Sequence, residues 1–241
     1  MIRSKTAVIL MAALVILVSC GGGGGGGPTP IEGPQVSRPS GSGGASVNDA
    51  GSLVLDRALS YTFDPFSDSE LVAAGSITMN ISVVVNDNPV QTIPNGISSG
   101  RVDMAIQAPA SGFVSATEFF NWVLEGDFSH FIKQGHSVQC GFIDLAGTGD
   151  QFLVLVNNPM AKQDEEEPSK HFLAGLYYWF IYAQGDVLVE GSHRHGDYGF
   201  DVSVRLAQGW NILRGNQTGA ILVLESAGIP NSAQWVLSKD H

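Results

Sequence analysis

Apolar residues alternate with polar ones over residues 76–85, 101–107 and 200–206. A period of two places the apolar side chains on one face of a β-strand, where they can be buried while the other face meets solvent. Shorter apolar runs, each bounded by Gly, Pro, Asn or Asp, occur at 152–156, 187–190, 210–213, 220–224 and 235–237. The pattern predicts a chain of many short strands.

Two segments depart from this alternation. Residues 172–182 are apolar on both faces, which fits either a buried strand or a helix. The aromatic residues and the turn that follows favour a central strand. Ser115 to Glu118 is a possible capping box, and apolar residues follow at helical spacing until Gly126. These elements predict an all-β fold, β-sandwich-like, with one short helix.

The first residues are typical of an export signal. Arg3 and Lys5 precede an unbroken apolar run from Ala7 to Val18, which ends in Leu17-Val18-Ser19-Cys20. The run is shorter than the roughly 20 residues of a membrane-spanning helix. The ending resembles the lipobox of bacterial lipoprotein precursors. That resemblance implies a cleaved signal peptide over 1–19 and a diacylglyceryl group on Cys20, with further acylation of the new amine.

The lipobox resemblance also carries expectations about location. Two or more acyl chains are needed for stable attachment to a membrane, so membrane lipid is the partner expected for Cys20. In the resembling family, an Asp after the Cys commonly retains the protein at the inner membrane. This chain has Gly21 there, so the outer membrane or the cell surface is favoured for this extracytoplasmic protein.

Residues 20–52 are expected to form the lipidated Cys and a flexible linker. Seven glycines are followed by prolines and by Gly41-Ser42-Gly43-Gly44, with almost no apolar side chain to bury. The composition becomes globular from about Leu53. We therefore expect a β-rich extracytoplasmic domain over 53–241, in which one core or two small cores are both compatible with the length.

The C-terminal part carries a second resemblance. A Tyr-rich strand from Leu176 to Ala183, an Asp-Val strand from Asp186 and the turn Gly209-Trp210-Asn211 follow one another. This order is similar to that of uncharacterised Gly-tethered bacterial surface lipoproteins, in which Gly-Trp-Asn is the sharpest element. The resemblance implies location and fold but no activity. Trp210 itself is predicted to be a packed residue.

The charge of the chain narrows the choice of partners. The formal net charge is −11, and removal of Arg3 and Lys5 with the signal would make it −13. No basic patch interleaved with aromatic residues is present, which argues against nucleic-acid binding. Attraction to anionic lipid headgroups is disfavoured for the same reason.

Candidate chemical groups are few. If Cys20 is lipidated, Cys140 has no cysteine left in the chain with which to form a disulfide. Cys140 lies in an apolar strand-like run and is therefore expected to be a buried, inert thiol. Gly96-Ile97-Ser98-Ser99-Gly100 matches a hydrolase motif, but it stands between predicted strands, where a nucleophile elbow does not form. His193 and His195 could share a strand face and chelate a metal. Their glycine-rich flanks favour a solvated hairpin tip with no metal.

Other polar and aromatic groups have plain structural readings. The acidic run from Asp164 to Glu167 is expected to be a solvated loop, because it lacks the spacing of a calcium loop. Most aromatic residues occupy inward strand positions and are expected in the core. A few exposed Trp or Tyr side chains could form a sugar-stacking platform.

Three classes of function therefore stay open. The first, which we favour, is an anchored binding or structural module with no catalytic residue and no cofactor, whose partner is an envelope protein or a glycan. The second is a sugar- or peptide-handling enzyme that uses carboxylates not recognisable in sequence. The third is an accessory subunit of an envelope complex. A cleft with two carboxylates, an exposed aromatic row or a flat apolar face would separate them.

The lipobox supplies the first testable prediction. Cys20→Ser removes the acylated thiol, so the protein should leave the membrane fraction or persist as an unprocessed precursor, and it should incorporate no labelled palmitate. Fractionation and electrophoretic migration of the variant in the source bacterium measure this. A variant that fractionates and migrates like the wild type would rule out the lipid anchor.

Overall fold

The computed structural model describes residues 34–65, 70–164, 169, 171–196, 198–218 and 220–239. Within these residues the chain forms sixteen β-strands and one α-helix, α1 (Ala116–Val123). The strands are β1 (Ala45–Val47), β2 (Leu53–Phe63), β3 (Val72–Ala73), β4 (Met79–Val85), β5 (Asn88–Ser98), β6 (Arg101–Ile106), β7 (Val114–Ser115), β8 (Ile132–Gln134), β9 (Gln139–Ala146), β10 (Gln151–Gln163), β11 (His171–Ala183), β12 (Val187–His195), β13 (Tyr198–Leu206), β14 (Gly209–Thr218), β15 (Ile221–Ser226) and β16 (Gln234–Lys239).

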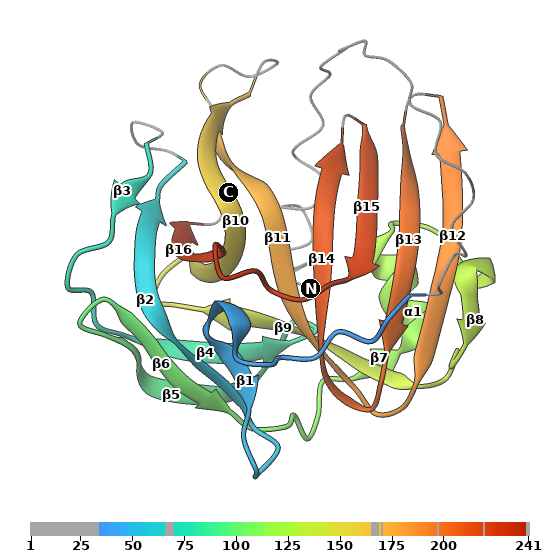
Figure 1. Cartoon of the computed structure of the whole chain (residues 1–241), viewed down its shortest axis with the longest axis horizontal. Helices are drawn as coiled ribbons and strands as arrows, with labels where there is room; N and C mark the ends of the chain where they lie inside the picture. The colour runs from blue at the N-terminus through green and yellow to red at the C-terminus, as the bar shows by residue number, and fades with distance from the viewer. Residues whose placement is uncertain are drawn as a thin grey trace.

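The strands belong to one continuous sheet that closes on itself in one half of the domain. Neighbours run in the order β9-β4-β5-β6-β2-β16-β10, and β10 then pairs back with β9. The first core cluster fills this ring, with Leu55, Ile81 and Trp235 among its fully buried members. Figure 1 shows the ring on the left and the strands that continue from it on the right.

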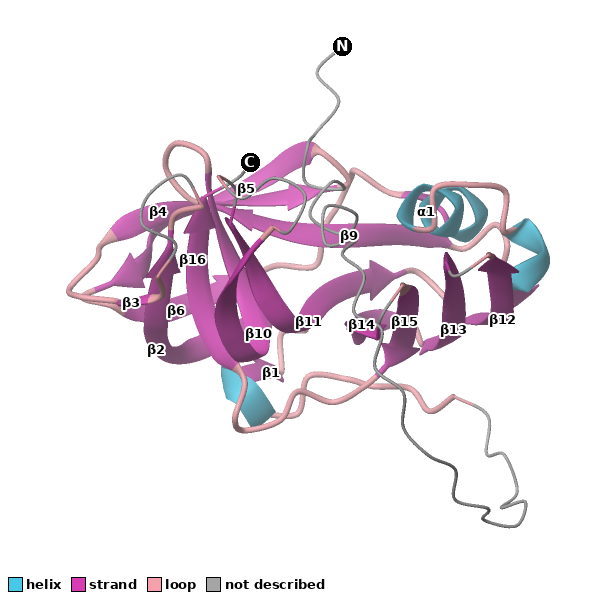
Figure 2. Cartoon of the chain, turned by 90° about the horizontal axis from the view of Figure 1, so that it is seen from above, coloured by secondary structure: helices cyan, strands magenta, loops and turns pink. Residues whose placement is uncertain are grey.

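The other half of the domain is an open extension of the same sheet. From β11 the order continues as β14-β15-β13-β12-β8, and Figure 2 shows α1 and part of β9 lying across these strands. A second core cluster fills the space between them. It includes Phe119 and Phe120 from α1, Ile181 from β11 and Val204 from β13.

The predicted all-β character is confirmed, but a sandwich is not, because the strands join into a single sheet that closes into a ring. The local elements follow their sequence signals. Ser115 caps α1 through its Oγ, which accepts a hydrogen bond from the amide of Glu118. Asn86 and Asp87 take positive φ angles in the turn between β4 and β5, the conformation that a tight hairpin needs.

The domain begins earlier than the sequence predicts. The expectation of a flexible linker up to residue 52 is wrong for residues 34–52, because the folded domain supplies this segment with partners. The strand Ala45–Val47 pairs with β2, and the Ser37 carbonyl accepts a hydrogen bond from the amide of Ile212. The Gly51 carbonyl accepts one from the Trp210 indole, over 3.0 Å.

Glycine is required in this segment, and its lack of a side chain is what allows the close packing. Gly43 has φ +64, and a Cβ placed there would lie 2.0 Å from the Cγ2 of Ile229, which is 3% exposed. A composition poor in apolar side chains therefore indicated disorder where the backbone itself is packed. The predicted signal peptide 1–19, Cys20 and residues up to 33 lie outside the described residues.

The packing of residues 34–52 generates the second prediction. Gly43→Ala should lower the free energy of unfolding by about 1–3 kcal/mol, because the added methyl overpacks against Ile229 and takes a strained φ. Thermal melting should show a drop of several degrees. Gly75→Ala is the matched control, since a Cβ there meets nothing within 4 Å. Equal melting temperatures for the two variants would show that residues 34–52 are a linker that does not pack against the domain.

Candidate functional site

Three strands meet at a fork where the closed and open parts of the sheet separate. β9 pairs with β11 as far as Ile143, opposite Phe180, and with β10 at Ala146, opposite Phe152. β10 and β11 pair with each other from Leu155, opposite Tyr178. The pairings leave a triangular gap between the three strands. Its edges are residues 144–145 of β9, 153–154 of β10 and Trp179 of β11.

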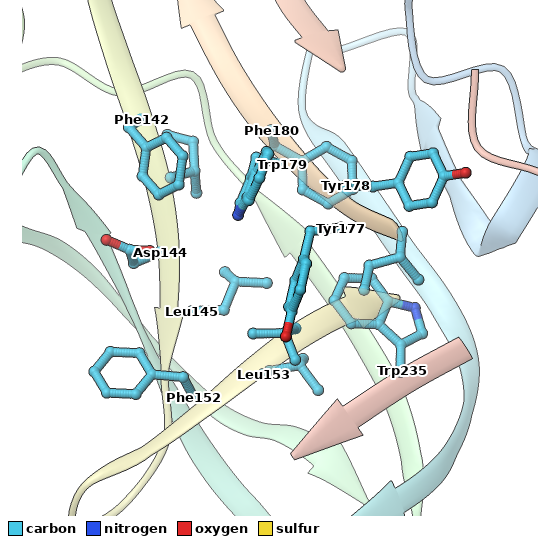
Figure 3. Close-up of a pocket in the computed structure, with 13 residues that line it drawn as sticks. Phe142, Asp144, Leu145, Phe152, Leu153, Tyr177, Tyr178, Trp179, Phe180 and Trp235 are labelled. Atoms are coloured by element: carbon cyan, nitrogen blue, oxygen red, sulfur yellow. The ribbon is translucent and has the colours of Figure 1, made fainter. Parts of the chain in front are cut away.

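The gap contains a cavity of about 60 Å³, which we call the fork cavity. That volume suits a compact chemical group rather than a whole cofactor, since cofactor pockets are several times larger. Figure 3 shows the lining side chains. They are Phe142, Ile143, Asp144, Leu145, Phe152, Leu153, Val154, Leu155, Tyr177, Tyr178, Trp179, Phe180 and Trp235.

The lining has an inner and an outer part because side chains alternate along each strand. Leu145, Leu153 and Trp235 belong to the first core cluster and form the inner part. Tyr177 and Trp179 from β11 and Phe142 from β9 lie outside that cluster. The fork cavity therefore reaches from side chains that belong to or pack against the second and third core clusters to the buried core of the ring.

Two aromatic rings on β11 are arranged in parallel. Tyr177 and Trp179 are both half-buried, with ring centroids 5.9 Å apart and planes 7° apart. Trp179 lies against β14 at Gly215, where a Cβ would stand 2.2 Å from the indole. A side chain at 215 would therefore displace the ring. Figure 3 shows the indole nitrogen on the side of Trp179 that faces β9.

The tyrosine hydroxyls of the lining already have partners. The Tyr177 hydroxyl donates a hydrogen bond to the Leu173 carbonyl, and burial raises the pKa of Tyr177 above its usual range. Burial also raises the pKa of Tyr178, against the opposing effect of its hydrogen bond with Arg214. Both hydroxyls stay protonated at neutral pH. Asp144 is the one carboxylic acid among the described lining residues.

The floor of the cavity holds an unusual polar group. Trp235 is 1% exposed, and its indole nitrogen has no hydrogen-bond partner. The ring is held in place by a near-parallel contact with Phe180, at a centroid distance of 6.3 Å. A buried N–H without a partner is uncommon in folded proteins, and here it belongs to a residue that lines the cavity.

The candidates from sequence lie away from the fork cavity. His193 and His195 are exposed at the end of β12, and His193 packs edge-on against Phe128, with centroids 5.3 Å apart. Arg194 between them forms an ion pair with Asp201 over 2.8 Å. In the described part of the chain, no three His, Cys, Asp or Glu side chains are grouped so that they could hold a metal ion.

The hydrolase-like motif has the setting that the sequence predicts. Ser98 ends β5 and Arg101 begins β6, and Ser99 and Gly100 form the turn between them with positive φ angles. No helix follows Ser98, so the strained strand–turn–helix of a nucleophile elbow is absent there. Most of the acidic run, Glu165 to Glu167, lies outside the described residues.

The predicted turn at Gly209-Trp210-Asn211 is wrong, because these residues begin β14 and pair with Ala183, Tyr182 and Ile181 of β11. Trp210 is 4% exposed and packs edge-on against Tyr182, with ring centroids 5.2 Å apart. Asn211 is completely buried, and its side chain bonds to the backbone of Ala207 at both its oxygen (2.9 Å) and its nitrogen (2.8 Å). The prediction that Trp210 packs in the core is confirmed.

The fork cavity itself was not predicted from sequence. The sequence predicts that Tyr177 and Trp179 lie in the core with the other aromatic residues, and Asp144 sits inside an apolar run typical of an ordinary strand. Their spacing offered one signal, because residues two apart on a strand share a face. The gap opposite them depends on pairing between distant strands.

Comparison with protein-family models, curated proteins and solved structures gives no significant match. None of the helices in the described part of the chain has the length and apolar character needed to cross a lipid bilayer.

Cys140 supplies a prediction about pH. It is buried, as the sequence predicts, and burial raises the pKa of its thiol from 9.0 to about 12. The unfolded chain loses this proton above about pH 9 while the native protein keeps it. The stabilisation is thus complete below pH 9 and is lost as the pH rises toward 12.

Denaturant unfolding measures the size of this effect. Between pH 9 and 11 the wild type should lose up to about 1.4 kcal/mol per pH unit more than Cys140→Ala. The two proteins differ only in this side chain, so the difference between their profiles isolates the thiol. Parallel pH profiles for the two proteins would contradict the raised pKa.

Proposed function

We propose that the chain is a lipid-anchored envelope or surface lipoprotein whose β domain is a binding module without catalytic activity. In this proposal acylated Cys20 attaches the protein to membrane lipid on the extracytoplasmic side, at the outer membrane or the cell surface. The support for the anchor is the basic n-region, the apolar run and the Leu-Val-Ser-Cys ending. The partner is a component of the envelope, a protein or a glycan.

The single observation that carries the binding role is the fork cavity. Its lining combines parallel half-buried rings, Tyr177 and Trp179, with a carboxylate, Asp144. Concave, mostly aromatic sites with a few polar groups are the usual form of small-ligand sites. A catalytic reading lacks support among the described lining residues, because general acid–base work by a carboxylate pair needs a second acid beside Asp144.

The proposal keeps the sandwich-like packing for one half of the domain. The second core cluster supports it, since α1 and β9 contribute one side of that cluster and β12 and β13 the other. The fork therefore lies at the boundary between the closed ring and the layered half. A ligand in the fork cavity can contact residues of both core clusters.

A fragment screen by two-dimensional NMR of the purified chain tests the binding role. The panel should contain monosaccharides, amino acids and small organic ions. We expect perturbed amide signals to concentrate on the facing segments of β9, β10 and β11. Trp179→Leu keeps an apolar side chain at the same place but removes the indole, so it should weaken binding about tenfold, as loss of a stacking contact does.

Trp122→Leu is the matched control, because Trp122 contacts Phe142 from α1 but does not line the cavity. It should bind the same fragments as the wild type. Perturbations that map to another surface, or that survive unchanged in Trp179→Leu, would overturn the assignment of the fork cavity as the binding site.

A further inference from the structure

The pairing between β5 and β6 is short. Within the described residues it ends at Ile97, opposite Val102. The same register continued would set Pro94 opposite Ala105, and proline has no N–H to donate across the strands. Asn95 takes a left-handed φ of +52 and donates its N–H to a side chain of β4, over 2.9 Å. β5 therefore turns away from β6 here, and Figure 2 shows β5 alongside β4 and β6 alongside β2.

Beyond Val102, a side chain of β5 reaches across to β6. The side-chain amide of Gln91 donates a hydrogen bond to the Ala105 carbonyl over 3.4 Å and accepts one from the Gln107 N–H over 3.2 Å. Those two backbone groups therefore point away from β2 and toward β5. A side-chain amide carries the same kinds of donor and acceptor as a peptide group. Gln91 thus bonds to β6 where the backbone of a neighbouring strand would bond.

Residues 103–107 form an exposed strand edge on the side facing β5, which we call the β6 edge. Backbone groups of every second residue point to the same edge of a strand, so those of Asp103 face the same side as those of Ala105. Asp103, Ala105 and Gln107 are exposed, whereas Met104 and Ile106 are buried in the first core cluster. An exposed edge of this kind is a template for pairing with another extended chain.

The outward side chains at the β6 edge carry negative charge. Asp103 lies directly opposite Asp56 of β2. Arg101 donates a hydrogen bond from Nε to the Asp56 carboxylate over 2.6 Å, whereas Asp103 has no ion-pair partner among the described residues. Opposite charges on neighbouring strands attract each other and like charges repel. A strand added along β6 would therefore favour a basic side chain beside Asp103.

We propose that the β6 edge binds an extended segment of a partner protein as an added β-strand, which takes the place of the Gln91 side-chain amide. The segment has basic side chains on its outward face, beside Asp103, and apolar side chains on its inward face, continuing the face of Met104 and Ile106. None of the residues of the β6 edge lines the fork cavity. The proposal therefore adds a second binding site, whose partner is a polypeptide.

Titration of the purified chain with the peptide acetyl-(Val-Lys)4-amide, followed by two-dimensional NMR, tests strand addition. The backbone amides of Asp103 and Ala105 should shift, and their hydrogens should exchange with solvent about tenfold more slowly, because they gain hydrogen-bond acceptors. Two control peptides should bind at least about tenfold more weakly. Acetyl-(Val-Glu)4-amide reverses the charge, and the Val-Lys peptide with every amide N-methylated keeps the charge but has no backbone donor.

Three variants test the edge itself. Ala105→Pro removes an edge N–H whose strand neighbour is not β2, so the fold should persist while the Val-Lys peptide binds at least about tenfold more weakly. Ala105→Val keeps that N–H and is the matched control, with binding within about twofold of the wild type. Gln91→Ala removes the side chain that competes for Ala105 and Gln107, so the peptide should bind about fivefold more tightly.

The outcomes separate strand addition from simple charge attraction. Equal binding of the N-methylated peptide, or equal binding by Ala105→Pro and Ala105→Val, would show that charge alone attracts the peptide and would refute the added strand. Equal binding of the Val-Glu peptide would overturn the basic character of the partner. If residues 103–107 do not respond in the wild type or in Gln91→Ala, Gln91 alone completes this edge and the site does not exist.

Discussion

The architecture depends on β9 being shared between two parts of the sheet. One edge of β9 pairs with β4, and the other pairs first with β11 and then with β10. A strand edge can satisfy its hydrogen bonds with one neighbour at a time, so the change of partner opens a gap between the two. The pairing with β10 closes the ring, and the pairing with β11 starts the open extension. The fork cavity is the necessary product of this double use.

The change of partner also explains the distribution of the apolar residues of β9. Leu145 faces the first core cluster, whereas Cys140 and Phe142 face the second. A strand with one face in each core must be apolar on both faces, and residues 140–143 are all buried. Asp144 lies where the strand leaves the second core and meets the gap. Its position inside an apolar run follows from the geometry of the fork.

The sequence predicts the elements of this fold better than their assembly. Period-two alternation located the strand around Ile81, and the capping signal located the helix after Ser115, because both are local properties of the chain. The fork depends on register between β9, β10 and β11, whose partners lie up to 43 residues apart in sequence, as Ala183 and Cys140 do. Neither alternation nor composition contains that information.

Residues 34–52 are a second case in which the sequence does not predict how segments assemble. Their packing also shortens the tether between the folded domain and the proposed lipid anchor. Ser37 bonds to β14 in the open extension, while β1 pairs with β2 in the ring, so residues 34–52 connect both halves of the domain. In the proposed lipoprotein, only residues 21–33 then separate Cys20 from the folded part. Thirteen residues span at most about 47 Å when fully extended, against about 115 Å for a free segment of residues 21–52. If Cys20 carries the proposed lipid anchor, the domain is held closer to the lipid surface than composition suggests, and a partner has to lie within that shorter range.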